Sequence, residues 1–214
     1  MNFLIVHAHP STDSFSQAMT ERATASLGAA GHAVVVSDLY RMGFDPVSDR
    51  RNFTSQFDAE HLDIQLEEKH AAQIGTFAPD LVQEMEKVAW CDVLILQFPI
   101  WWLSVPAIMK GWIDRVFACG FAYGGGRHFD SGVFRGKTAL CALTLGGTAE
   151  NYSDGNTYAD IERVLYPIRR GVFEFLGFTA LDPHPVYAPT RMDDTQRAAA
   201  LDAYEARLLE IARR

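Results

Sequence analysis

The chain has 214 residues, of which 48% are hydrophobic and 21% charged, and these values are typical of a globular protein rather than a disordered one. Its formal net charge of −8 gives no basic surface of the kind that binds nucleic acid or anionic membranes. Three cysteines are too few and too scattered for a disulfide framework or a zinc site, so no metal is expected.

No membrane span or signal peptide is visible. The longest apolar stretch, residues 93–109, is interrupted by polar residues and prolines, whereas a span needs about 20 predominantly apolar residues. Cys91 and Cys141 lie in apolar runs, so we expect buried free thiols of the kind found in a reducing compartment. These observations predict one cytoplasmic domain over residues 1–214.

Strand and helix patterns alternate from the N-terminus. The apolar run Asn2–Ala8 predicts a buried strand, and Ser14 is expected to cap a helix that ends near Gly31. His32–Ser37 predicts the second strand. The segment Asp38–Thr76 is long, polar and irregular, so we expect it to be functional or to pack against a partner.

The later elements continue this alternation. In chain order they are a helix at Ala78–Ala89, a strand at Asp92–Phe98, a helix at Pro106–Phe117, a strand at Lys137–Leu145, a helix at Tyr158–Phe175, a strand at Phe178–Tyr187, and a final helix opened by a capping box of Asp193 and Gln196. Pro167 should kink or split its helix. Two prolines in the last strand indicate an edge position.

This alternation predicts an α/β fold with a parallel sheet and helices on both faces. We expect the doubly wound arrangement, with five strands in the order 2-1-3-4-5. Ligands of such folds bind beyond the carboxyl ends of strands 1, 3 and 4, where the order of the strands reverses.

Unusual residues follow all three of these strands. His9, Ser14, Phe15 and Ser16 run into a helix N-terminus, which favours a phosphate, although a plain capping loop would also explain them. The sequence contains neither G-x-G-x-x-G nor a Walker A motif, so it does not indicate a dinucleotide Rossmann site or a P-loop.

The other two strand ends carry aromatic residues and glycines. Trp101 and Trp102 follow the third strand, and Gly146 and Gly147 follow the fourth. Ordinary core aromatics and a simple turn are the alternatives for these positions. Three such loops on one rim predict a site for a flat, phosphate-bearing cofactor, and a flavin satisfies every feature.

Several blocks resemble the NAD(P)H:quinone oxidoreductases (DT-diaphorases) in the same order along nearly the whole chain. The blocks are Leu4–His9 with Ser14-Phe15, Ser37–Tyr40, Gln97–Pro99, Pro106–Trp112, Arg115–Phe117, Phe121–Tyr123 and Gly146-Gly147. The resemblance implies a flavodoxin-like homodimer that binds FAD, with FMN as the alternative flavin. It also implies ping-pong hydride transfer from NAD(P)H through the flavin to a quinone.

The same resemblance assigns roles to particular residues. The flavin-binding set that it implies is His9, Ser14, Phe15, Ser16, Pro99, Ile100, Trp101, Trp102, Leu103, Thr144, Leu145, Gly146, Gly147 and Tyr152. The residues implied at the reacting end of the flavin are Tyr152, Gly146, Gly147 and Tyr158, with Tyr152 hydrogen-bonding near flavin O2. The implied substrate pocket consists of Trp102, Leu103, Arg191 and a Tyr123 that comes from the partner subunit.

Three positions depart from the family pattern. Tyr158 stands where the family has a proton-relaying histidine, Gly125 replaces a pocket tyrosine, and Arg191 aligns with a pocket histidine. Because tyrosine is rarely a base at pH 7, we expect Tyr152 to carry the electrostatic role. Trp112, Phe117, Phe121 and Tyr123 are expected at the surface, where they would be too apolar for open solvent, and this also predicts a homodimer.

Two other functions are compatible with such a chain. Similar bacterial proteins are accessory, regulatory subunits of potassium-efflux systems and retain quinone reductase activity, so a membrane-antiporter partner stays open. A one-electron carrier of the flavodoxin type is disfavoured because the chain lacks that family's phosphate loop and has the extra Asp38–Thr76 segment.

Overall fold

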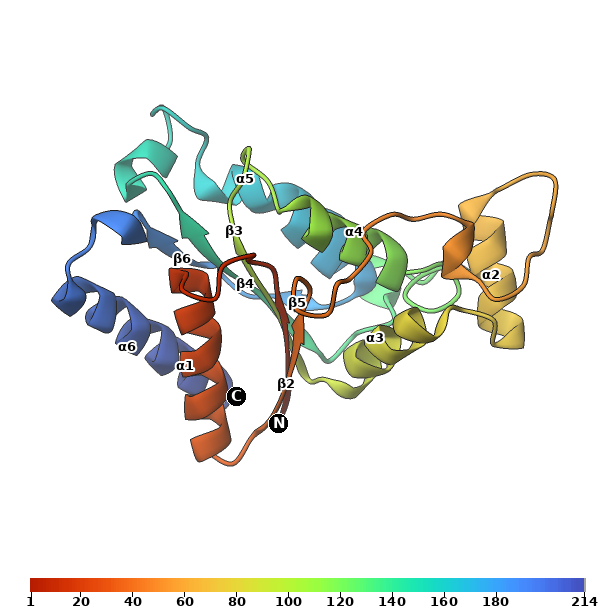
Figure 1. Ribbon diagram of the computed structural model, residues 1–214, viewed down its shortest axis with the longest axis horizontal. Helices are drawn as coiled ribbons and strands as arrows, with labels where there is room; N and C mark the ends of the chain where they lie inside the picture. Colours follow the sequence, from red (N-terminus) through yellow and green to blue (C-terminus); the bar gives the residue numbers. More distant parts are fainter. Residues whose placement is uncertain (214) are drawn as a thin grey trace.

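A parallel sheet with the order β2-β1-β3-β4-β5 runs through the computed structural model, which describes residues 1–213 (Figure 1). The strands are β1 (Asn2–His7), β2 (Ala33–Asp38), β3 (Val93–Pro99), β4 (Thr138–Leu145), β5 (Thr179–Ala180) and β6 (His184–Tyr187). β1 and β3 are adjacent and parallel, although β2 lies between them in sequence. The predicted doubly wound order is therefore confirmed.

The edge of the sheet is formed by two short strands instead of one. β5 and β6 both pair with β4, so the predicted edge position is confirmed, but the single strand Phe178–Tyr187 was wrong. The Leu181 N–H still donates to the Ala139 carbonyl at 2.9 Å. Pro183 then follows without an N–H to donate, and the ladder resumes only at His184.

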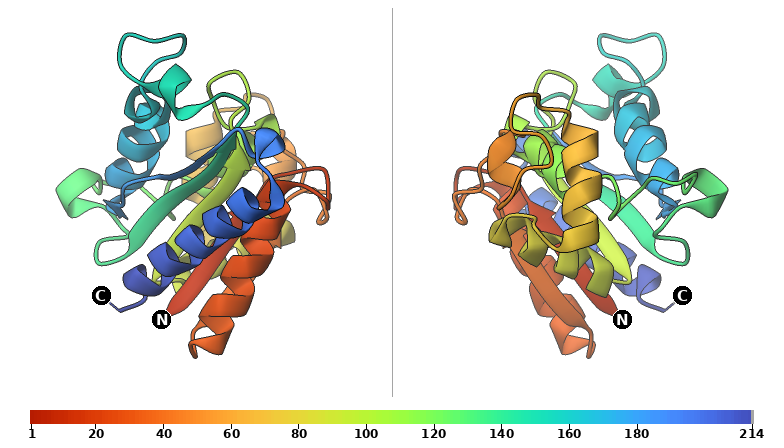
Figure 2. Two further views of the ribbon diagram at one scale, coloured as in Figure 1. Left: turned by 90° about the vertical axis from the view of Figure 1, so that its left-hand side faces the viewer. Right: turned by 90° about the vertical axis from the view of Figure 1, so that its right-hand side faces the viewer.

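Helices cover both faces of the sheet. They are α1 (Phe15–Ala29), α2 (Ile64–Ile74), α3 (Pro79–Trp90), α4 (Ala107–Val116), α5 (Ile161–Ile168) and α6 (Asp194–Ile211). Figure 2 shows α1 and α6 side by side on one face, with α3, α4 and α5 on the other. Ser14 caps α1 by accepting from the Gln17 N–H at 3.1 Å, and the predicted capping box of Asp193 and Gln196 opens α6.

Helix α5 changes its winding just after Pro167. The α-helix ends at Ile168, and the chain continues as a π-helix over Arg169–Glu174. A proline inside a helix removes one backbone hydrogen bond and its ring clashes with the carbonyl one turn earlier, so the regular α-helical ladder is interrupted here. The predicted split is therefore confirmed.

The segment between β2 and α3 is more regular than we expected, because it contains α2. This helix buries Glu67 and Glu68 instead of an apolar stripe, and Figure 1 shows it projecting from the sheet. The Glu68 carboxylate accepts the Cys119 N–H at 2.7 Å, and burial raises the pKa of Glu68 to about 7. The segment thus packs against its own chain.

Helix α4 contacts residues 45–52, which precede α2 in this segment. The buried Arg115 donates to the Asn52 side chain at 2.7 Å and to the Asp45 carbonyl at 2.6 Å. Gly111 is needed for this approach, because a Cβ there would lie 2.2 Å from the Pro46 carbonyl oxygen.

The aromatic run that begins within α4 is less exposed than its sequence indicates. Trp112 is fully buried and donates its indole N–H to Glu84 at 2.9 Å, and Phe117 is buried beside it. The expectation that these two residues lie at the surface was wrong, since both belong to the core. Cys91 and Cys141 are buried free thiols, as predicted. Among residues 1–213, no helix is both long and apolar enough to cross a membrane.

Candidate functional site

A cavity of about 670 Å³ lies at the carboxyl ends of β1, β3, β4 and β6. It is lined by predicted cofactor residues from the three loops: His9, Ser14, Phe15, Ser16, Pro99, Ile100, Trp101, Thr144, Leu145 and Gly146. Its volume falls within the roughly 300–1,000 Å³ that small-molecule and cofactor sites occupy. The topology therefore brings these loops to one hollow at the edge where the order of the strands reverses.

The first turn of α1 forms one wall of this cavity. The N–H groups at the start of a helix have no partner within the helix, and the helix dipole makes this end attractive to anions. The Ser14 hydroxyl accepts from the Gln17 N–H, so its own hydrogen is free to be donated. Together these groups can bind a phosphate.

Two buried hydroxyls join the α1 wall to the β4 wall. The Ser16 Oγ and the Thr144 Oγ1 are 3.1 Å apart, and both side chains line the cavity. Only one hydrogen can lie between the two oxygens, so the other hydroxyl has a hydrogen that it can donate elsewhere.

The loop after β3 is a tight turn with strained backbone. Trp101 and Ser104 exchange two backbone hydrogen bonds of 3.0 Å around Trp102 and Leu103, whose φ angles are 53° and 55°. Turns with two such residues normally contain Asn-Gly, because bulky side chains are unfavourable in this region. The Trp102 side chain is fully exposed, so nothing within residues 1–213 holds it.

The two glycines after β4 have different surroundings. A Cβ on Gly146 would meet no atom within 4 Å, so this residue leaves open space at the cavity. A Cβ on Gly147 would lie 3.0 Å from Tyr152 and 3.3 Å from Tyr158. Gly147 therefore allows the two tyrosines to pack closely on the backbone, with their ring centroids 4.9 Å apart.

Burial keeps two side chains at the carboxyl ends of the strands, Tyr152 and His7, uncharged near neutral pH. Burial, reinforced by Tyr158, raises the pKa of Tyr152, so its phenol remains a hydrogen-bond donor. Burial lowers the pKa of His7, the last residue of β1, whose Nδ1 atom lies 2.9 Å from the Thr20 hydroxyl oxygen. Arg197 on α6 brings a positive charge to the lining of the cavity, which also contains Asp13.

Sequence reasoning missed the residues that α6 and the turn before it contribute. They are Pro189, Thr190, Arg197 and Leu201. We predicted the site from the rule that ligands of doubly wound folds bind at the ends of the strands where the strand order reverses. The missed residues instead follow the edge strand β6. The capping box of Asp193 and Gln196 was the available signal, because it placed a second helix N-terminus at the same edge of the sheet.

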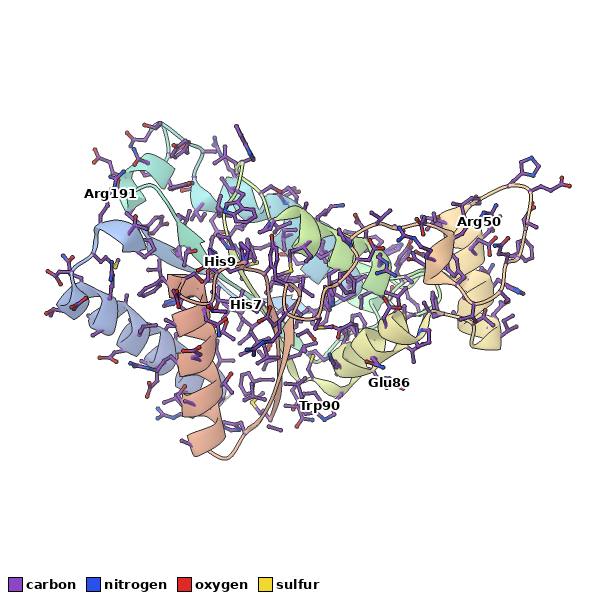
Figure 3. The ribbon with its side chains drawn as sticks, viewed as in Figure 1. His7, His9, Arg50, Glu86, Trp90 and Arg191 are labelled. Atoms are coloured by element: carbon purple, nitrogen blue, oxygen red, sulfur yellow. The ribbon has the colours of Figure 1, made fainter. Side chains whose placement is uncertain are left out.

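Not every predicted site residue lines the cavity. Trp102 and Gly147 directly follow lining residues, and Leu103 comes one residue later. Tyr152 and Tyr158 pack on Gly147. Figure 3 shows His9 at the start of α1 and Arg191 farther out, and Arg191 is exposed on the turn before α6.

Tyr123 lies elsewhere in this chain. It packs on Phe175, with ring centroids 5.9 Å apart, and its hydroxyl is 3.4 Å from the Gln65 amide nitrogen on α2. In residues 1–213, no group of three or more His, Cys, Asp or Glu side chains could hold a metal ion.

Comparison with known proteins gives a consistent result. A family model described as flavodoxin-like fold matches residues 1–209. The chain is 38% identical over 206 residues to rat NAD(P)H dehydrogenase [quinone] 1, which covers 96% of this chain and 75% of the relative. It is 37% identical over 209 residues to human ribosyldihydronicotinamide dehydrogenase [quinone], covering 97% of this chain and 90% of the relative.

A solved structure agrees closely with this fold. The structure, described as a candidate quinone reductase from Klebsiella pneumoniae, superposes with a TM-score of 0.95 at 39% identity. The match covers 99% of this chain and 85% of that one.

Proposed function

We propose, since this chain belongs to the flavodoxin-like family of NAD(P)H dehydrogenases (quinone), that it is a flavin-dependent NAD(P)H:quinone oxidoreductase. The observation that carries this proposal is the cavity of about 670 Å³ lined by the three switch-point loops. The chemistry that a bound flavin supplies is the acceptance of a hydride from NAD(P)H and its delivery to the quinone.

The residues present fit a flavin. The first turn of α1 and the Ser14 hydroxyl offer donors for phosphate, and Arg197 adds a positive charge. The open space at Gly146 leaves room for a flat ring to approach the backbone of the β4 loop. Ile100 and Trp101 supply the apolar side of the cavity against which such a ring can lie.

FAD is favoured over FMN. The cavity continues past the α1 N-terminus to Pro189, Arg197 and Leu201. An isoalloxazine ring with a single phosphate needs only the three switch-point loops, so the α6 side offers a place for an adenosine. Arg197 lies where it can neutralise a second phosphate.

The protein's own groups orient the reactants and stabilise charge. The backbone of Gly146 and Gly147 and the Tyr152 hydroxyl are proposed to donate hydrogen bonds at the pyrimidine end of the ring, where negative charge develops. Trp102 and Leu103 are proposed to wall the pocket in which the nicotinamide and the quinone stack in turn, which gives ping-pong turnover.

A homodimer completes this pocket in the proposal. Trp101, Trp102 and Leu103 expose apolar surface beside a cavity that is open in the single chain. Tyr123 and Phe175 form an aromatic pair away from that cavity, where they are available to a partner's pocket. The accessory role in a potassium-efflux system would use the same chemistry and stays a prediction.

The experiment begins with the purified protein and its colour. Cofactor released by denaturation is identified by chromatography, and the holoenzyme is then reduced anaerobically with NADPH or NADH and reoxidised with a benzoquinone. We expect FAD, one equivalent of NAD(P)H consumed per flavin, and reoxidation by the quinone. A chain that takes up neither FAD nor FMN would contradict the flavin proposal, and recovery of FMN alone would contradict the FAD assignment.

A further inference from the structure

The loop between β4 and α5 is closed by a single side chain, that of Asn151. Its Oδ1 atom accepts the Thr148 backbone N–H at 3.1 Å and the Thr148 hydroxyl at 3.0 Å. Its Nδ2 atom donates to the Thr157 hydroxyl at 3.4 Å. The Asn151 side chain therefore joins the start of residues 148–158 to their end.

The backbone of Asn151 strengthens the same closure. Its N–H donates to the Thr148 carbonyl at 3.0 Å, and its carbonyl accepts the Tyr158 N–H at 2.8 Å. Tyr152 follows Asn151 directly, so both tyrosines of the pair that packs on Gly147 are attached to this point. Elsewhere in residues 148–158, Ser153 donates to the Glu150 carbonyl at 2.8 Å, Asn156 donates to Ser153 at the exposed tip, and the Tyr152 ring centroid lies 6.0 Å from that of Tyr187.

We propose that Asn151 is a positioning residue for the reaction, because it fixes the Tyr152 phenol beside the Gly146-Gly147 backbone. This inference rests on the proposed function, since it assumes that Tyr152 stabilises the ring of a bound flavin. Asn151 does not line the cavity and acts only through Tyr152 and the loop.

The chemistry of an amide suits this position. An amide presents an acceptor and a donor on one rigid group, so one side chain can bind Thr148 and Thr157 at the same time. A carboxylate would keep the bonds to Thr148 but lose the donor to Thr157, and a leucine would lose all three. The Asn151 side chain bonds both Thr148 and Thr157, at the two ends of the loop, so the opening equilibrium of the loop is expected to respond to each of these bonds.

The test uses Asn151→Ala and, as a matched control, Asn156→Ala in the same loop. Asn156 also makes a side-chain hydrogen bond, but at the tip and not at the closure. The first readout is chymotrypsin cleavage after Tyr152 and Tyr158, which needs no cofactor and tracks the open population of the loop. We expect about tenfold faster cleavage in Asn151→Ala and little change in Asn156→Ala.

The second readout separates positioning from simple stability. In the holoenzyme, stopped-flow reduction by saturating NAD(P)H should be about five- to tenfold slower in Asn151→Ala, whereas the flavin dissociation constant and the melting temperature stay close to those of Asn156→Ala. If Asn151→Ala does not fold, Thr148→Val removes only one of the three side-chain bonds and should show the same pattern more weakly.

Two results would overturn the inference. Cleavage of Asn151→Ala at the rate of Asn156→Ala would show that the closure does not hold the loop. Faster cleavage with an unchanged reduction rate would show that the closure does not position Tyr152. A wild-type chain that binds no flavin would instead contradict the proposed function, while the cleavage result would still decide whether Asn151 holds the loop.

Discussion

The Ser16 hydroxyl lies 3.1 Å from the Thr144 hydroxyl, although the two residues are 128 positions apart in the chain. Ser16 lies in the first turn of α1, and Thr144 is the second-to-last residue of β4. This contact therefore joins two walls of the cavity. Both hydroxyls are buried, so removal of either one leaves the other buried without this hydrogen-bond partner.

Thr144→Val should therefore weaken both folding and cofactor binding. The substitution keeps the shape of the side chain and leaves the Ser16 hydroxyl buried without its partner, which costs about 1–3 kcal/mol. We expect a comparable fall in the free energy of unfolding and a roughly five- to tenfold weaker flavin affinity, measured by urea denaturation and calorimetric titration.

A second threonine of β4 provides the control for this change. The Thr138 Oγ1 atom is buried and has no hydrogen-bond partner within residues 1–213. Thr138→Val should leave the unfolding free energy unchanged or raise it, because no hydrogen bond is lost. Equal losses in the two variants would contradict a specific role for the Ser16–Thr144 contact.

Tyr152→Phe should slow the reduction of the bound flavin by about tenfold or more, a loss of about 1.4 kcal/mol of transition-state stabilisation. Tyr158→Phe should change turnover little, because that ring is partly exposed and packs on Tyr152. Stopped-flow reduction by NAD(P)H measures both variants. A larger defect in Tyr158→Phe would mean that Tyr158 has the proton-relay role.

Trp102→Ala should lower quinone kcat/KM by about tenfold with almost no loss of stability, because removal of a fully exposed side chain changes the unfolding free energy by only about 0.5 kcal/mol or less. Trp90 on α3, which Figure 3 shows far from His9, is the control. Trp90→Ala should leave kcat/KM unchanged and reduce stability, since that indole is 38% exposed and otherwise packed. Steady-state kinetics and thermal unfolding distinguish the two patterns.

Acid should destabilise the protein through His184. Burial, reinforced by Arg207, lowers the pKa of this residue to about 4, below its usual value near 6.5. As the pH falls from about 6.5 to about 4, the unfolded chain takes up a proton that folded His184 resists, so stability is lost over this window. The loss can reach about 3 kcal/mol at most.

His184→Phe should reduce that acid loss and keep the ring contact with Tyr204, whose centroid is 4.9 Å away. Urea denaturation at pH 7, 5.5 and 4.5 measures the difference from wild type. His61→Gln is the control, because the His61 side chain is 83% exposed. An identical pH dependence in wild type and His184→Phe would rule out His184 as a source of acid sensitivity.

Sedimentation at micromolar concentration should show a homodimer. Tyr123→Ala should then lower quinone turnover without releasing the flavin, because Tyr123 does not line the cavity of its own chain and is proposed to enter the partner's pocket. A monomer with full activity would contradict the shared pocket.

The fold could be predicted because the strands are short runs of apolar and β-branched residues, and because strands and helices alternate along the chain. Helix α2 could not, since it buries Glu67 and Glu68 against backbone N–H groups and therefore lacks an apolar stripe. The local sequence signals for α2 are its capping residues, Asp63 at the start and Gly75 at the end. Trp112 was misjudged for a similar reason: its indole N–H is satisfied by Glu84, a partner that spacing along the chain does not reveal.

The candidate site could be predicted at the level of strand ends. Its α6 wall could not, because Arg197 and Leu201 reach the cavity only through the packing of α6 beside α1. The positive φ angles of Trp102 and Leu103 were equally hidden, since neither residue type favours that conformation.

The turn at Trp102 and Leu103 also bears on attempts to make the protein more durable. Left-handed backbone at a residue other than glycine costs roughly 1–2 kcal/mol, so an Asn-Gly replacement at these two positions would rank among the first choices of any thermostabilisation campaign. Such a variant would gain heat resistance by discarding the indole at the cavity mouth. Engineers who want a longer-lived catalyst should therefore leave residues 101–104 untouched and seek their gains on the far side of the sheet.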